Sequence, residues 1–253
     1  MAAIPLLFIE NNKIINYYII MKLAIIILVY NTKPEYLKEC LDSIYSSTFQ
    51  DFIIILVNDG STVKYPFLDR DRLIVLTNSE NKGIPYSCNL AFNYVKENYP
   101  NSYAVRVDSD DKVSPSLFEK EVSFLDSHLD HIAVCTNLKH FGLKETVIKR
   151  PSVWSLSRAK YLYHGYGYAP TMMFRASALD KAMCDERYHI CEDFDFHLKL
   201  LKQGKIASIQ EDDLYFKRSH PTQITRLVFN DVRRKLIRQI IEEHLGEPKK
   251  LII

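Results

Sequence analysis

The sequence predicts an α/β protein with a mostly parallel sheet flanked by helices, built as one continuous domain. Runs of branched apolar residues occur at 23–29, 52–57, 73–76 and 103–107. Such uninterrupted runs are typical of strands that are buried on both faces. Predicted helices follow the runs at 23–29 and 73–76, and the resulting strand–helix–strand units place neighbouring strands parallel to each other.

The first predicted helix follows the strand at 23–29. Thr32 and Glu35 have the spacing of a capping box, and Pro34 suits a first helical turn. Apolar residues then recur at helical spacing, at Leu37, Leu41 and Ile44. Further helices are expected at 87–97, 116–127 and 193–202.

Both ends of the chain differ from this pattern. Residues 1–21 are interpreted as an N-terminal extension, in which an extra strand, an anchor and an over-long start are all left open. Residues 221–253 are predicted to form a C-terminal amphipathic helix, over about 227–245, and a tail. Its apolar stripe is expected to contain Val228, Val232, Leu236 and Ile240, with Arg233, Arg234 and Arg238 elsewhere on the helix.

Composition excludes several classes of protein. The 33 Lys and Arg residues nearly balance 31 Asp and Glu residues, so the formal net charge of +2 speaks against a nucleic-acid partner. Five scattered cysteines form no C-x-x-C pair, which argues against a disulfide framework or a zinc ribbon and favours a reducing, cytoplasmic compartment. A peripheral contact of the basic C-terminal helix with a membrane surface is left open, although a solvated helix face is favoured.

An acidic cluster follows the strand at 103–107. In extended backbone Asp108 and Asp110 project to the same side, so both carboxylates can face one hard cation, Mg²⁺ or Mn²⁺. A turn and helix cap without metal is an equally good interpretation of this segment by itself. An EF-hand is excluded, because Lys112 and Val113 stand where an oxygen ligand and glycine belong.

A second acidic site opens the helix predicted at 193–202. Glu192 and Asp193 in a first turn are favoured by the helix dipole without any catalytic duty. A carboxylate in this place can also act as a general base, provided that it reaches a bound hydroxyl.

Taken in order, these segments resemble family-2 glycosyltransferases of GT-A fold. The matching motifs are the strand ending at Tyr30-Asn31, the segment 56–61 with Asn58 in place of the usual first Asp, Asn81-Lys82-Gly83 with Asn89 downstream, Asp108-Ser-Asp110-Asp111, Gly167 to Arg175, and Glu192-Asp193. The likeness covers roughly residues 22–220. It implies a nucleotide-sugar half at 22–112 and an acceptor half at 113–220.

The resemblance implies a role for each matching residue. Asp59 would accept a hydrogen bond from the nucleotide base beside a stacking Tyr30, and Asp193 would be the general base that deprotonates the acceptor hydroxyl. Asp110, with Asp111 as the close alternative, would coordinate the cation, and His220 matches a further metal ligand in some relatives. The remaining residues assigned to nucleotide-sugar binding are Asn31, Lys82, Gly83, Asn89 and Asp108.

The implied enzyme is an inverting, nucleotide-sugar-dependent hexosyltransferase. It would use Mn²⁺ or Mg²⁺ and transfer sugar from a donor, preferably a UDP-sugar, to a glycan or glycoconjugate acceptor. Two alternatives remain, a GT-A-like nucleotidyltransferase and a non-catalytic nucleotide-sugar-binding module. Lys199, which stands where the family often has Arg, and Asn58 leave the identity of the donor open.

Overall fold

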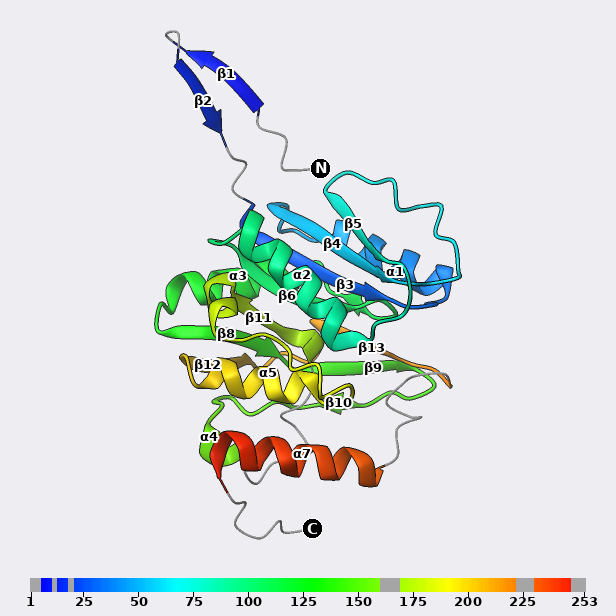
Figure 1. The fold of residues 1–253 in the computed structure, drawn as a ribbon, viewed down its shortest axis with the longest axis vertical. Helices are drawn as coiled ribbons and strands as arrows, with labels where there is room; N and C mark the ends of the chain where they lie inside the picture. Colours follow the sequence, from blue (N-terminus) through cyan, green and yellow to red (C-terminus); the bar gives the residue numbers. More distant parts are fainter. Residues whose placement is uncertain (1–5, 11–12, 18–20, 160–168, 222–229, 247–253) are drawn as a thin grey trace.

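The computed structural model describes the chain except for residues 1–5, 11–12, 18–20, 160–168, 222–229 and 247–253 (Figure 1). Its strands are β1 (Leu6–Glu10), β2 (Lys13–Tyr17), β3 (Leu23–Val29), β4 (Phe52–Asp59), β5 (Leu73–Asn78), β6 (Tyr103–Asp108), β7 (Lys112–Val113), β8 (His131–Thr136), β9 (Leu138–Gly142), β10 (Val147–Ile148), β11 (Met172–Arg175), β12 (Lys205–Ile209) and β13 (Tyr215–Ser219). Its α-helices are α1 (Pro34–Tyr45), α2 (Ile84–Asn98), α3 (Leu117–Ser127), α4 (Leu156–Ala159), α5 (Glu192–Leu201) and α7 (Asn230–Leu245), with 3-10 helices at Ala169–Thr171 and Ala176–Asp180.

The main sheet has seven strands in the order β12-β8-β11-β6-β3-β4-β5. Strand β3 pairs parallel with β4 and β6, and β4 pairs parallel with β5. Only β11 runs antiparallel to its neighbours in this sheet, β6 and β8. The mostly parallel sheet predicted from the branched apolar runs is therefore confirmed.

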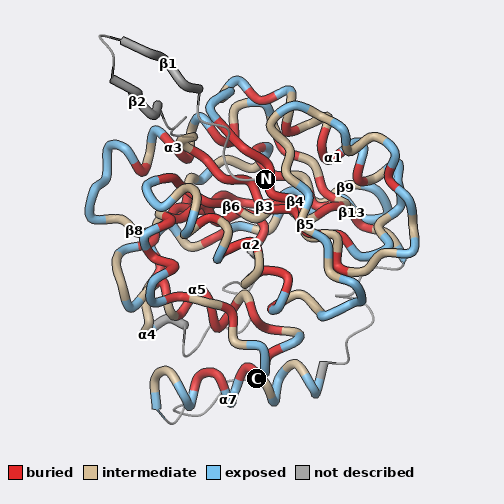
Figure 2. The backbone as a smooth tube through the Cα atoms, turned by 45° about the horizontal axis from the view of Figure 1, so that its top comes forward, coloured by how far each residue is buried: buried red, intermediate tan, exposed pale blue. Residues whose placement is uncertain are grey.

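Helices cover both faces of the main sheet. Side chains along β3 and β4 point alternately to the two faces of the sheet. Those on one face pack with α2, α5 and α7, and those on the other face pack with α1 and α3. Figure 2 shows these central strands as buried between the two helical layers. The alternation explains why β3 is apolar along its whole length.

A four-stranded sheet in the order β10-β9-β13-β7 positions the second half of the chain beside the first. Strand β13 pairs antiparallel with the short β7, which follows the acidic cluster. His220, directly after β13, is thereby brought next to residues that lie 110 positions earlier in the sequence.

The structure corrects two local predictions. Helix α1 begins after Lys33, and Thr32 provides no side-chain cap; its hydroxyl lies 2.7 Å from the Ser109 hydroxyl. In α7 the expected stripe is confirmed in part, because Ile240 is buried and Leu236 packs against the core, but Val232 is 52% exposed. The buried residues of α7 are Ile237, Ile240 and Ile241, and Val228 lies outside the described residues.

The N-terminal extension contains the antiparallel strand pair β1–β2. In Figure 1 this hairpin projects away from the two larger sheets. None of the described helices has the length and apolar character needed to cross a bilayer.

One buried acid in α3 makes stability depend on pH. Glu121 is fully buried, and among the described residues neither of its carboxylate oxygens has a hydrogen-bond partner. Burial raises the pKa of Glu121 well above its usual range. Because the folded-state pKa exceeds the unfolded-state pKa, the folded state loses stability relative to the unfolded state as pH rises above the unfolded value of about 4.3.

Glu121→Gln is expected to stabilise the protein at pH 8 and to have little effect near pH 4.5, because glutamine keeps the shape of the acid and cannot ionise. The gain should grow by about 1.4 kcal/mol per pH unit until the folded-state pKa is reached. Urea denaturation of both proteins from pH 4.5 to 8 measures it. The exposed Glu97→Gln on α2 is the control and should change stability at neither pH. A gain for Glu121→Gln that is the same at every pH would contradict the explanation.

Candidate active site

A cavity of about 320 Å³ lies at the carboxyl ends of β3, β4 and β6. Ligands of open parallel sheets bind at this edge. Both acidic sites predicted from the sequence contribute to it. The lining residues with polar or aromatic side chains include Tyr30, Asn31, Lys33, Tyr36, Asp59, Arg106, Asp108, Ser109, Asp110, His189, Glu192, Asp193, Lys217, His220 and Arg233.

The loop after β3 supplies an exposed aromatic ring and a structural amide. Tyr30 is 51% exposed and lines the cavity, so its ring is accessible to a ligand. Asn31 has a left-handed backbone with a φ of 51°. Its side-chain oxygen accepts hydrogen bonds from the backbone N–H and the hydroxyl of Thr62, at 2.9 and 3.1 Å. Asn31 therefore holds the loop after β4 against the loop after β3.

Asp59, at the end of β4, holds the loop after β5 by accepting three hydrogen bonds. The donors are the Asn78 amide at 2.7 Å and the backbone N–H groups of Lys82 and Gly83, both at 2.9 Å. Gly83 has a φ of 90°, which favours glycine at this position. Lys82 and Gly83, both predicted to bind the nucleotide sugar, thus contact Asp59 through their backbone and are not among the residues lining the cavity.

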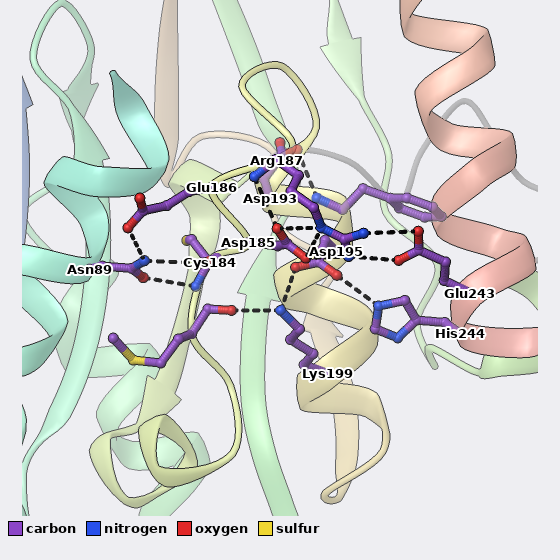
Figure 3. A network of polar contacts seen from close by, with 12 residues as sticks. Asn89, Cys184, Asp185, Glu186, Arg187, Asp193, Asp195, Lys199, Glu243 and His244 are labelled. Atoms are coloured by element: carbon purple, nitrogen blue, oxygen red, sulfur yellow. Dashed lines mark hydrogen bonds and ion pairs between the residues drawn. The ribbon is translucent and has the colours of Figure 1, made fainter. Parts of the chain in front are cut away.

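Asn89, the other residue of that motif, lies on α2 and does not line the cavity. Its side chain bonds the backbone N–H and C=O of Cys184, at 2.9 and 3.0 Å (Figure 3). The structure therefore places Asn89 as a link between α2 and the segment that leads to α5.

The acidic cluster is brought together by a turn rather than by extended backbone, which corrects the geometry expected from the sequence. The Asp111 N–H donates to the Asp108 carbonyl at 3.0 Å. One carboxylate oxygen from each of Asp108, Asp110 and Asp111 lies within 4.8 Å of the others.

The three carboxylates differ in their surroundings. Asp111 is fully buried and accepts hydrogen bonds from the Tyr215 hydroxyl at 2.8 Å and the Arg218 N–H at 2.7 Å. Burial, together with the neighbouring aspartates, raises the pKa of Asp111 well above its usual range. Only Asp108 and Asp110 line the cavity.

Asp110 follows β6 of the main sheet and lies beside His220, which follows β13 of the four-stranded sheet. Its Oδ2 lies 2.7 Å from His220 Nε2, and both residues line the cavity. The His220 ring also packs against the Tyr36 ring, with centroids 5.4 Å apart. The structure thus places the histidine predicted as a metal ligand beside the aspartate predicted to hold the cation.

Arg106, which sequence reasoning missed, connects the two acidic sites. Its guanidinium lies 3.4 Å from the Asp108 carboxylate and 3.1 Å from the Glu192 carboxylate. Burial opposes ionisation of Asp108, but Lys217 and Arg106 outweigh it and lower the pKa of Asp108. The only sequence signal for this link is a charged residue inside an otherwise apolar strand.

Glu192 and Asp193 open α5, as predicted, but have different surroundings. Glu192 is 5% exposed, and burial, with the neighbouring Asp193 charge, raises its pKa to about 8. Asp193 lines the cavity together with Asp110, and its Oδ1 accepts the Phe194 N–H at 2.8 Å. The base and metal ligand implied by the resemblance therefore lie in one cavity. Gly167 and Tyr168 of the intervening motif lie outside the described residues.

The model of Glycosyl transferase family 2 matches residues 24–186, which include β3 to β6, the acidic cluster and β11. The chain belongs to glycosyl transferase family 2. The predicted family is thus confirmed, while α5 and α7 lie beyond the matched segment.

Relatives and solved structures agree with the family and the fold. The uncharacterized glycosyltransferase EpsJ of Bacillus subtilis is 23% identical over 81% of this chain, which spans 63% of the length of EpsJ. The crystal structure of S. aureus TarS 1-349 in complex with UDP-GlcNAc superposes with a TM-score of 0.71 at 20% identity, covering 90% of this chain and 68% of that one. The mannosyltransferase PcManGT from Pyrobaculum calidifontis, in complex with GDP-Man and Mn2+, has a TM-score of 0.60 at 18% identity, with coverages of 84% and 60%. The predicted GT-A fold is confirmed.

Proposed function

We propose that this protein is a metal-dependent, inverting glycosyltransferase that moves a sugar from a nucleotide-diphosphate sugar to an acceptor hydroxyl. One observation carries the proposal: Asp110, His220 and Asp193 line the same cavity at the carboxyl ends of the parallel strands. An in-line displacement at an anomeric carbon needs charge stabilisation on the leaving-group side and a base on the acceptor side. This cavity contains candidates for both.

The residues present fit a hard divalent cation, Mn²⁺ or Mg²⁺. Carboxylate oxygens and one imidazole nitrogen are suitable ligands for Mn²⁺, and Mg²⁺ prefers the oxygens. Asp110 and His220 are the best placed, because both line the cavity and their polar atoms converge. Asp111 is less suitable, since Tyr215 and Arg218 already use both of its oxygens. When bound, the cation supplies Lewis-acid charge that offsets the charge of a departing diphosphate.

Base stacking, proton acceptance and positioning are assigned to residues of the protein. Tyr30 offers a ring for stacking on the nucleotide base, beside the loop that Asp59 organises. Asp193 accepts the proton of the acceptor hydroxyl, which raises the nucleophilicity of its oxygen. Arg106 acts as a positioning residue, because its contacts with Asp108 and Glu192 tie the donor-side turn to the start of α5. A single displacement on opposite faces of the anomeric carbon inverts its configuration.

A UDP-sugar is the proposed donor. TarS, which gives the highest TM-score quoted above, has been crystallised with UDP-GlcNAc, whereas PcManGT has been crystallised with GDP-Man. Asn58, which replaces the first Asp of the family motif, accepts the Ser61 N–H at 3.0 Å. That contact keeps the turn after β4 without an acidic side chain, so the substitution is compatible with a nucleotide site.

Thermal-shift screening of UDP- and GDP-sugars with and without Mn²⁺ tests the proposal. A donor at about 100 times its Kd adds about 2.7 kcal/mol of stability, which for a chain of this size raises Tm by roughly 5 to 10 °C. We expect that shift for at least one donor and expect EDTA to remove most of it. Stability that is unchanged by every donor, with Mn²⁺ present, would refute the proposed donor site.

A further inference from the structure

Helix α7 is integrated into the core although it lies beyond the segment that the family model matches. Its buried face, made by Ile237, Ile240 and Ile241, packs in the same core cluster as Cys191 and Phe194 at the start of α5. Helix α7 therefore packs against the N-terminal end of α5, which carries Asp193.

Two polar links fix the end of α7 against α5 and the segment before it (Figure 3). His244 Nε2 lies 2.7 Å from Asp195 Oδ1, and the other Asp195 oxygen accepts Lys199 at 2.7 Å. Glu243 pairs with Arg187 at 2.9 Å, and Arg187 in turn pairs with Asp185. Asp195 is only 1% exposed, so the His244 contact is shielded from water.

Arg233 lies on the same face of α7 as His244, because eleven residues correspond to about three helical turns. It lines the cavity together with Asp193. An aliphatic residue at 233 would extend the apolar stripe of Ile237 and Ile240. The helix instead places a permanently charged guanidinium there, where it reaches the cavity.

The charges around Arg233 place it on the acceptor side. The two deeply buried cations of the cavity, Arg106 and Lys217, both contact Asp108 on the donor side, and Arg106 also contacts Glu192 at the start of α5. Arg233 instead lies near the Cys191 thiol, directly before α5: burial and the Asp193 charge raise the pKa of this thiol to about 12, and the Arg233 guanidinium opposes the rise. Arg233 and Asp193 both line the cavity, and Asp193 lies in the first turn of α5. A carboxylate base repels an anionic acceptor, and a neighbouring guanidinium offsets this repulsion.

We propose that Arg233 binds an oxyanion, a phosphate or a carboxylate, that the acceptor carries near its reacting hydroxyl. The inference rests on the proposed function and adds the chemical class of the acceptor. It also makes α7 part of the acceptor site. Guanidinium groups suit this task because their planar donors match both oxyanions.

Matched acceptor fragments test the inference. Glycerol is compared with glycerol 1-phosphate, and glucose with glucuronate, by calorimetric binding to the protein saturated with UDP and Mn²⁺. We expect at least one anionic fragment to bind about tenfold more tightly than its neutral partner. The phosphate pair and the carboxylate pair then distinguish the two oxyanions.

Arg233→Gln should abolish this preference and leave UDP binding within about twofold, whereas Arg233→Lys should retain part of it. Arg234→Gln is the matched control, because Arg234 is exposed on the neighbouring position. The Tm of each variant reports whether it folds. Equal binding of both members of each pair by the wild type, or an anion preference that persists in Arg233→Gln, would overturn the inference. Loss of UDP binding in Arg233→Gln would overturn it as well, by assigning Arg233 to the donor. Failure of the wild type to bind UDP at all is a separate readout, which would contradict the proposed function itself.

Discussion

Asp193→Asn is expected to lower the rate of sugar transfer by about 10²- to 10⁴-fold, the range that a positioned general base contributes. Asparagine is nearly isosteric, and its side-chain oxygen can still accept the Phe194 N–H, so the start of α5 should keep its geometry. It cannot accept a proton from the acceptor. The transfer rate at saturating substrates and the calorimetric Kd for the donor measure the two effects separately, and the Kd should stay within about twofold.

The control for this variant is Asp213→Asn, an exposed carboxylate that does not line the cavity. It should transfer sugar at the wild-type rate. Transfer by Asp193→Asn within tenfold of wild type would remove Asp193 from the role of base. Weaker donor binding in proportion to the lost rate would indicate a binding role instead.

Asp110→Asn is expected to abolish the dependence of donor binding on Mn²⁺ and to reduce transfer by roughly 10²- to 10³-fold. The size follows from the several kcal/mol that a bound cation contributes to charge stabilisation, at 1.4 kcal/mol per tenfold in rate. Asp110 lines the cavity with a carboxylate oxygen 2.7 Å from His220 Nε2, so it is the carboxylate best placed to share a cation with that imidazole. Donor titrations with and without Mn²⁺ measure the dependence.

Asp111→Asn is the matched comparison, one residue away. Both oxygens of Asp111 are taken by Tyr215 and Arg218, so this variant should keep the Mn²⁺ dependence. If Asp111→Asn loses the dependence and Asp110→Asn keeps it, the metal ligand is Asp111 and the assignment made here is wrong.

The strands and helices that carry the site were predictable because their signals are local. The branched apolar run of β3 and the helical spacing of α1 report burial on two faces and on one face, respectively. Local rules failed where a side chain found a distant partner. Thr32 has the sequence of a cap, but its hydroxyl lies beside Ser109 instead, since the loop after β6 approaches the loop after β3. Val232 has the spacing of a core residue, yet the rotation of α7 is set by Ile237 and Ile240 packing behind α5.

By itself, the sequence determined the α/β class, the family and the two acidic sites, because alternation, spacing and motif order are properties of neighbouring residues. Tertiary structure decided which of those acids face the cavity. Asp110 lies beside His220, whereas Asp111 accepts hydrogen bonds from residues of β13. Both arrangements depend on the pairing of β7 with β13, two strands that lie about a hundred residues apart in the sequence. Tertiary structure also brought Arg106 and Arg233 to the site, since the partners of a charged side chain depend on which elements pack around it and leave no periodic trace in the chain.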